Sequence, residues 1–156
     1  MARFVACDPE LPPASELLAE MAVELNEMYG TPSRLDRPAL APSELRAPDG
    51  TYLVGWEGQV AVAGGGVRRT DDDVGEIKRM FVRPAARSRG IAAELLTALE
   101  GAARSLGYRR VRLDTGPKQD HAERLYRRAG FAAIAPYNDN PFASFWGEKE
   151  LDRPLP

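Results

Sequence analysis

A basic segment in the middle of the chain has the residue types and spacing of a phosphate-binding site. Residues 77–93 contain no acidic side chain, although the net charge of the whole chain is −2. The basic residues of this stretch are Lys78, Arg79, Arg83, Arg87 and Arg89. Within it, the pattern Arg87-x-x-Gly90-x-Ala92 lies where an expected strand gives way to an expected helix. The first N–H groups of a helix lack internal partners and carry partial positive charge, so this junction predicts an anion site.

Two positions of the pattern would let a ligand approach the main chain closely. Gly90 has no side chain, and Ala92 has only a methyl group. A basic surface loop with a glycine in a turn would have the same composition, and this interpretation competes with the anion site. A P-loop is excluded, because it needs Gly-x-x-x-x-Gly-Lys-Ser/Thr and the segment has no Lys-Ser/Thr pair. The neighbouring elements favour the anion site over the plain loop.

Before the basic segment, the sequence predicts one helix and an antiparallel meander. Leucine and methionine recur at helical spacing over residues 13–29, and Gly30-Thr31-Pro32 ends this helix. Recurring prolines predict a surface loop over residues 31–50, with a short turn of helix at 42–45. The strands expected next span residues 51–56, 59–68 and 75–82.

After the basic segment, helices alternate with strands. Apolar residues from Ile91 to Leu106 lie on one face of an expected helix that Gly107 ends. A strand at 110–115 and a helix at 119–129 follow, and Gly130 ends this helix. The tail predicts an apolar piece at 131–134, a turn at 136–141 and a last strand at 142–149. This order predicts an α+β (mixed α/β) fold, a sheet flanked by helices, in a single domain covering residues 1–156.

Composition excludes several classes of protein. The 156 residues suit one domain, and 44% hydrophobic with 28% charged residues is typical of a globular chain. The single cysteine, Cys7, excludes an internal disulfide, and neither it nor the single histidine, His121, lies in a metal-ligand spacing. The sequence has no apolar run near the ~20 residues of a membrane span and no basic, then apolar start. We therefore expect a cytoplasmic protein with no metal, no membrane and no nucleic-acid partner.

Two motifs resemble those of the GNAT superfamily of N-acetyltransferases. Strand Glu76-Ile77-Lys78-Arg79-Met80-Phe81-Val82 followed by Arg87-x-x-Gly90-x-Ala92 is similar to its acetyl-CoA signature, Gln/Arg-x-x-Gly-x-Gly/Ala. Residues 122–131, Ala-Glu-Arg-Leu-Tyr-Arg-Arg-Ala-Gly-Phe, resemble its second motif, Ala-x-x-Leu-Tyr-x-x-x-Gly-Phe. The resemblance covers about residues 75–131. It implies the GNAT acyl-CoA N-acyltransferase fold, with a central mixed, mostly antiparallel sheet, and acetyl-CoA as co-substrate.

The resemblance also implies which residues bind acetyl-CoA. In the family, strand backbone pairs with the pantetheine arm and the helix start binds the pyrophosphate. The corresponding residues here are Met80, Phe81, Val82, Arg87, Ser88, Arg89, Gly90, Ile91, Ala92, Gln119 and Tyr126. Two positions depart from the family pattern, since many members have Gly in place of Ser88 and Asn in place of Gln119. The first departure concerns one backbone contact to the pyrophosphate, and the second a hydrogen bond to the pantetheine arm.

Glu76 and Tyr126 are the catalytic candidates by the same resemblance. An alkyl amine with a pKa of about 10.4 is about three units from neutrality, so deprotonation costs roughly 4 to 5 kcal/mol. The leaving thiol has a pKa of about 8.5, so a base should matter more than an acid. Glu76 matches the family's base, acting directly or through water, and Tyr126 matches the tyrosine that hydrogen-bonds the thioester sulfur. The alternatives are a surface ion pair of Glu76 with Lys78 or Arg68 and simple packing of Tyr126.

The acceptor site of this fold lies between the region after the first helix and the loop before the last strand. These regions correspond to residues 29–40 and 137–146. The candidate substrate-binding residues are Tyr29, Tyr137, Asn138, Asn140 and Trp146, a mixture of amide and aromatic groups that suits a small polar ligand. A turn with core aromatics behind it would explain the same residues.

The resulting hypothesis is transfer of the acetyl group of acetyl-CoA to a primary amine of a small molecule, by direct attack in a ternary complex. Two alternatives stay open: a protein lysine or N-terminal acetyltransferase, and a non-catalytic acyl-CoA-binding module. A homodimer also stays open, because nothing in the sequence decides the oligomeric state.

Overall fold

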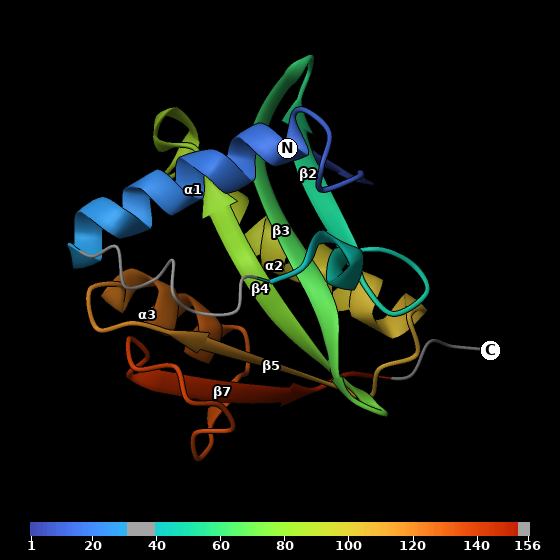
Figure 1. Cartoon of the computed structure of the whole chain (residues 1–156), viewed down its shortest axis with the longest axis vertical. Helices are drawn as coiled ribbons and strands as arrows, with labels where there is room; N and C mark the ends of the chain where they lie inside the picture. Colours follow the sequence, from blue (N-terminus) through green and yellow to red (C-terminus); the bar gives the residue numbers. More distant parts are fainter. Residues whose placement is uncertain (31–39, 153–156) are drawn as a thin grey trace.

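Seven strands form one mixed sheet in the computed structural model, which describes residues 1–30 and 40–152 (Figure 1). The strands follow the order β1-β2-β3-β4-β5-β7-β6. All neighbouring pairs are antiparallel except β4 and β5, which run parallel because the helix α2 crosses over between them. The strands are β1 (Arg3–Ala6), β2 (Thr51–Glu57), β3 (Val60–Asp71), β4 (Val74–Val82), β5 (Arg110–Thr115), β6 (Ala132–Ala133) and β7 (Phe145–Glu150). The predicted fold class, a mostly antiparallel mixed sheet flanked by helices, is confirmed.

The helices begin and end close to the predicted residues. They are α1 (Ala14–Tyr29), α2 (Ile91–Ser105) and α3 (Asp120–Arg128), with short 3-10 turns η2 (Pro42–Leu45) and η3 (Pro84–Ala86). After α1, Gly30 adopts a left-handed conformation, and its N–H donates to the carbonyl of Asn26 at 2.7 Å. No helix in the described part of the chain is both long enough and apolar enough to cross a bilayer.

Alternating side chains of the meander supply a separate hydrophobic cluster on each face of the sheet. On β2, Tyr52 and Val54 pack with Leu17 of α1, whereas the intervening Leu53 packs with α2. α1 and η2 therefore cover one face of β2 to β4, and α2 covers the opposite face (Figure 1). Tyr126 of α3 belongs to the same cluster as α2.

The last strand begins three residues later than predicted, at Phe145 instead of residue 142. Side-chain hydrogen bonds hold the preceding residues in turns: the N–H of Asn140 donates to Asn138 Oδ1 at 3.2 Å, and the N–H of Phe142 donates to Asn140 Oδ1 at 3.0 Å. The Ser144 N–H then donates to the carbonyl of Thr115 at 2.9 Å and brings the chain to the edge of β5. Asparagine side chains thus replace strand pairing in this stretch.

We predict that Tyr52→Phe stabilises the protein by about 1 kcal/mol, because a buried hydroxyl without a partner costs free energy. Tyr52 is 1% exposed, and among the described residues its hydroxyl is the one buried side-chain polar atom that lacks a hydrogen bond. Tyr108→Phe is the matched control, since the Tyr108 hydroxyl donates to the carbonyl of Asp49. Urea unfolding should show a loss of about 1 kcal/mol for the control. Equal losses in both variants would contradict the prediction.

Candidate active site

The site lies where β4 and β5 separate. Their parallel pairing covers only Val74 with Arg110, Gly75 with Val111 and Glu76 with Arg112. Beyond this point the two strands splay apart, as Figure 1 shows. The backbone of β4 after Glu76 therefore has an edge toward β5 that β5 does not use. This edge includes Met80, Phe81 and Val82, the residues whose main chain the family resemblance assigned to the pantetheine arm.

A bulge in β4 accompanies the separation. Gly64 pairs with Phe81 and Gly66 pairs with Lys78. Between these two pairs, one residue of β3 therefore lies opposite two residues of β4. Arg79, in the bulge, has a φ of 61°, which few residues other than glycine adopt. The bulge places the Lys78 side chain on the α1 face and Met80 in the cluster with α2. It was missed in the sequence, where the Gly64-Gly65-Gly66 run opposite it was its only signal.

The junction before α2 has the backbone of an anion site. Ser88 and Gly90 both have positive φ, 65° and 82°, and Gly90 caps the helix without a side-chain hydrogen bond. Ser88 thus takes a left-handed conformation that suits glycine, which gives a physical reason for the glycine of many family members at this position. The exposed N-terminus of α2 presents its first N–H groups beside this turn.

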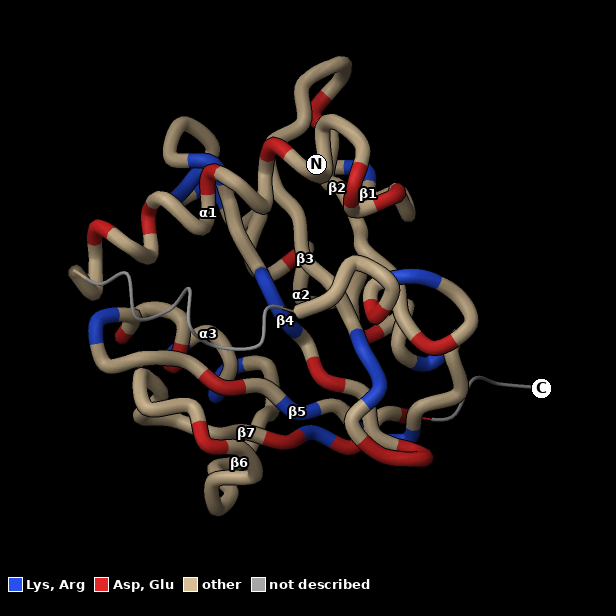
Figure 2. The backbone as a smooth tube through the Cα atoms, viewed as in Figure 1, with Lys and Arg blue, Asp and Glu red and all other residues tan. Residues whose placement is uncertain are grey.

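The basic side chains of this junction are paired with acids from elsewhere in the chain, which the sequence pattern did not reveal. Figure 2 shows acidic positions recurring along α1, beside the basic loop. Arg83 bonds Glu20 at 2.6 Å, and Arg87 bonds Glu24 of the same helix at 2.6 Å. Arg89 pairs at 2.7 Å with Glu57, at the end of β2. The local excess of positive charge in the sequence is therefore compensated in space, and the main chain becomes the chief candidate for phosphate binding.

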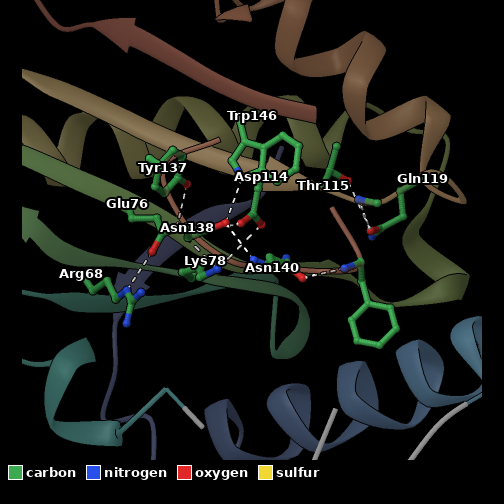
Figure 3. A network of polar contacts seen from close by, with 12 residues as sticks. Arg68, Glu76, Lys78, Asp114, Thr115, Gln119, Tyr137, Asn138, Asn140 and Trp146 are labelled. Atoms are coloured by element: carbon green, nitrogen blue, oxygen red, sulfur yellow. Dashed lines mark hydrogen bonds and ion pairs between the residues drawn. The ribbon is translucent and has the colours of Figure 1, made fainter. Parts of the chain in front are cut away.

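Glu76 is the centre of a buried polar network (Figure 3). Its side chain is 0% exposed, and Arg68 Nε donates to its Oε1 at 2.8 Å. The hydroxyl of Tyr137 donates to Oε2 at 2.7 Å, and Lys78 Nζ lies 3.5 Å from the same oxygen. The alternative of an ion pair with Arg68 or Lys78 is thus correct about the partners but wrong about the place, because the pair is buried and not on the surface.

Strand register explains why these charges meet. Arg68 pairs with Glu76, Glu76 with Arg112, and Arg112 with Glu148 of β7. Directly paired residues of neighbouring strands point to the same face, so the four side chains form a row of alternating charge across four strands. Arg112 Nε donates to Glu148 Oε2 at 2.8 Å, and its guanidinium lies 5.5 Å from the centre of the Tyr137 ring.

Asp114 joins the network from β5, although no sequence pattern pointed to it. It lies two residues after Arg112, hence on the same face, and its Oδ1 lies 3.7 Å from Lys78 Nζ. Asn138 donates to Asp114 Oδ2 at 2.7 Å, and Trp146 Nε1 donates to Asn138 Oδ1 at 2.9 Å (Figure 3). Tyr137, Asn138 and Trp146 are thus brought beside Glu76.

Tyr29 and Gln119 meet at a second place, next to the start of α3. Gln119 Oε1 accepts hydrogen bonds from the Gly116 N–H at 3.2 Å and from the Thr115 hydroxyl at 3.2 Å. The Tyr29 hydroxyl lies 3.4 Å from the same oxygen. The rest of the expected acceptor region after α1, residues 31–39, lies outside the described residues.

Tyr126 lies on the opposite face of the sheet from Glu76, buried in the cluster under α2 and α3. Its hydroxyl donates to the Sδ atom of Met80 at 3.8 Å, so it points at the strand edge that the resemblance assigned to the pantetheine arm. Burial, followed by the charge of Asp114, raises the pKa of Tyr126 to about 12. The group is therefore a neutral hydrogen-bond donor at physiological pH.

Comparisons with known proteins agree with this fold. The model of the acetyltransferase (GNAT) family matches residues 15–131. The chain is 33% identical over 146 residues to the IAA acetyltransferase of Azospirillum brasilense, covering 90% of this chain and 89% of that protein. It is 31% identical over 116 residues to an uncharacterized N-acetyltransferase of Bacillus subtilis, covering 71% and 77%.

Solved structures share the whole architecture. The crystal structure of an acyl-CoA N-acyltransferase from Klebsiella pneumoniae matches this chain with a TM-score of 0.76 at 28% identity. The match covers 97% of this chain and 99% of that one. A GNAT acetyltransferase from Elizabethkingia anophelis with acetyl-CoA bound has a TM-score of 0.69 at 16% identity, over 96% and 98%. The chain belongs to the GNAT family, and it is an acetyl-CoA-dependent N-acetyltransferase.

We predict that Gly90→Val abolishes the rise in Tm that CoA causes in the wild-type protein. A ligand that binds only the folded state stabilises it by about 2.7 kcal/mol at 100 times its Kd, and a side chain at Gly90 would occupy the phosphate approach. Gly107→Val is the matched control, because both glycines have positive φ, 82° and 93°, and no atom lies within 4 Å of an added Cβ. Both variants should lose similar stability without ligand. A normal CoA shift in Gly90→Val would place the phosphates elsewhere.

Proposed function

We propose that this enzyme transfers the acetyl group of acetyl-CoA to a primary amine of a small molecule, by direct attack within a ternary complex. The observation that carries the proposal is the buried carboxylate of Glu76 at the last pair before β4 and β5 separate. This position would put a base next to the opening in which the thioester would lie, between the strand edge at Met80 and the loop at Tyr137.

Acetyl-CoA would enter between β4 and β5. Its pantetheine arm would pair with the edge of Met80, Phe81 and Val82 that β5 does not use, as an added strand, and one N–H there would polarise the thioester carbonyl. The pyrophosphate would lie at the helix start, on the main chain of residues 87–92, with Gln119 beside the arm. The left-handed conformations of Ser88 and Gly90 support this placement, since residues of this kind in a turn can direct successive backbone N–H groups into an anion-binding concavity.

Glu76 is the proposed base. Its carboxylate is held by Arg68 and lies on the α1 face of β4, where the acceptor would approach. A buried carboxylate that hydrogen bonds hold in a fixed orientation can accept a proton without a rearrangement of solvent. This role requires the nitrogen to lose its proton toward β4 as it attacks the acetyl carbon.

Tyr126 is the proposed partner of the leaving sulfur, from the opposite face. With its pKa at about 12 and a thiol at about 8.5, complete proton transfer to the thiolate would be uphill by roughly 5 kcal/mol. The hydroxyl therefore stabilises the thiolate by donating a hydrogen bond, and the proton itself comes from solvent.

The loop before β7 supports a small acceptor. Tyr137, Asn138 and Trp146 are half-buried. Tyr137 donates to Glu76, Asn138 donates to Asp114 and Trp146 donates to Asn138, so this wall of the site is fixed by internal hydrogen bonds. A rigid wall with one aromatic hydroxyl and alternating charges suits a small polar amine. Tyr29 and Asn140 would complete the site toward α1.

Release of free thiol from acetyl-CoA tests the function directly. The acceptors are phenethylamine, spermidine and glycine as alkyl amines, aniline and 4-aminobenzoate as aryl amines, a lysine-containing peptide, and IAA, the compound in the name of one relative. Turnover with a small amine supports the proposal, and turnover with the peptide alone indicates a protein acetyltransferase. CoA binding without turnover on any acceptor would indicate a non-catalytic module.

We predict that Glu76→Gln lowers the rate by about 10²-fold or more for alkyl amines and by less than about tenfold for aryl amines. Gln keeps the size of the side chain but cannot accept a proton, and aryl amines are already neutral at pH 7. The ratio of the rates with the two amine types, measured in one variant, does not depend on how much of that variant is folded. Equal losses of rate for both amine types would show that Glu76 only positions other groups.

We predict that Tyr126→Phe lowers kcat by about tenfold to a hundredfold and leaves the Kd for CoA within about twofold, because only a hydrogen bond to the leaving sulfur is lost. Tyr108→Phe again serves as the control, since it removes a hydroxyl from a buried tyrosine of the same cluster. Unchanged kcat in Tyr126→Phe would make Tyr126 a packing residue.

A further inference from the structure

Both oxygens of Glu76 are already occupied by protein groups. Arg68 Nε donates to Oε1 at 2.8 Å and the Tyr137 hydroxyl donates to Oε2 at 2.7 Å, while the side chain is 0% exposed. An acceptor nitrogen has no direct access to either oxygen, because the Glu76 side chain is completely buried and Lys78 Nζ also lies 3.5 Å from Oε2. A base that acts on the substrate from this position therefore needs an intermediate group.

Tyr137 occupies the position that such a group requires. A carboxylate can only accept hydrogen bonds, so the Tyr137 proton points to Glu76 and the lone pairs of the phenol oxygen face away from it. Tyr137 is half-buried, whereas Glu76 is completely buried, so the tyrosine is the more accessible end of the pair. Its oxygen can accept a hydrogen bond from a donor outside the network.

The surroundings of Tyr137 hold its hydroxyl in place. The Arg112 guanidinium lies against the ring at 5.5 Å from its centre, and the next residue, Asn138, is bonded to Asp114 and to Trp146. Figure 3 shows Tyr137 between the loop and Glu76, with its hydroxyl directed at the carboxylate. The tyrosine is thus positioned on two sides, by β5 and by its own loop.

We propose that the Tyr137 hydroxyl receives the proton of the acceptor amine and passes its own proton to Glu76, so that Glu76 acts as a base through a tyrosine. This inference rests on the proposed function, amine acetylation at this site. It assigns to Tyr137 a catalytic role in place of simple substrate binding, and it places the acceptor nitrogen against the phenol oxygen.

The step balances as follows. The acceptor ammonium gives one proton to the Tyr137 oxygen while the original Tyr137 proton moves to Glu76 Oε2, so tyrosine ends neutral and Glu76 ends as a neutral acid. The nitrogen lone pair that is freed forms the N–C bond at the acetyl carbon. The C–S bond then breaks, its electron pair goes to sulfur, and CoA leaves as a thiolate that solvent protonates, while the second proton that the nitrogen loses on amide formation goes to solvent. Glu76 returns its proton to solvent in the next cycle.

Tyr137 carries the proton as a neutral phenol. Burial, followed by the negative charge of Glu76, raises the pKa of Tyr137 well above its usual value. The phenolate is therefore absent at neutral pH, and the hydroxyl can pass a proton only by accepting one as it donates another. Arg112, the cation against the ring, lowers this pKa, but its effect is smaller than those of burial and Glu76.

The test compares Tyr137→Phe, Glu76→Gln and the double variant in single-turnover acetylation of phenethylamine and the other alkyl amines of the panel. Tyr137→Phe keeps the ring against Arg112 and removes only the hydroxyl. We expect each single variant to lose about 10²-fold and the double variant to lose no more than either, because the two groups act in series. The Kd for CoA should stay within about twofold in all three, and Tyr108→Phe, whose hydroxyl also donates to one acceptor, should keep wild-type turnover.

A second measurement separates proton transfer from mere positioning of Glu76. The wild-type rate in mixtures of H₂O and D₂O should curve with the deuterium fraction, because two protons move together, whereas Tyr137→Phe should give a straight line. A straight line for the wild type, losses that multiply in the double variant, or unchanged turnover in Tyr137→Phe would each overturn the relay while leaving amine acetylation intact. A wild-type enzyme that acetylates no amine would overturn the proposed function and the relay with it.

Discussion

A row of alternating charges, Arg68, Glu76, Arg112 and Glu148, crosses four neighbouring strands on one face of the sheet. An isolated carboxylate at the depth of Glu76 would be costly, so its burial depends on the cation on the next strand. The row lies at the last hydrogen-bonded pair of β4 and β5. This row therefore lies at the end of the β4–β5 pairing and borders the proposed opening for acetyl-CoA.

The bulge in β4 is the second element of this arrangement. It inserts one residue opposite the glycines of β3, so Glu76 and Lys78 keep one face while Met80 turns to the other. A regular strand would place residues 76, 78 and 80 on the same face. The two catalytic candidates thus approach the opening from opposite sides, Glu76 from the face of α1 and Tyr126 from the face of α2 and α3.

The sequence predicted the elements well because its strongest signals are local. Helical apolar spacing before Gly107, or the glycine that follows α1, depends only on neighbouring residues. The GNAT motifs selected Glu76 and Tyr126 as catalytic candidates because they too are local patterns. The place of Asp114 in the network and the Arg112–Glu148 pair could not be predicted, because both depend on strand register, which no local sequence pattern specifies. The late start of β7 was missed because Asn138 and Asn140 bond to the main chain through their side chains.

The pairing of Arg83 and Arg87 with Glu20 and Glu24 would change the physical nature of the phosphate binding that is proposed at the start of α2. On a bare basic patch, an incoming phosphate releases small ions from solution, and the affinity falls steeply with added salt. Here the counter-ions of Arg83 and Arg87 are carboxylates of α1, so a phosphate bound by the main chain of the loop would release fewer ions from solution. Part of the ionic atmosphere of these arginines is thus built into the fold.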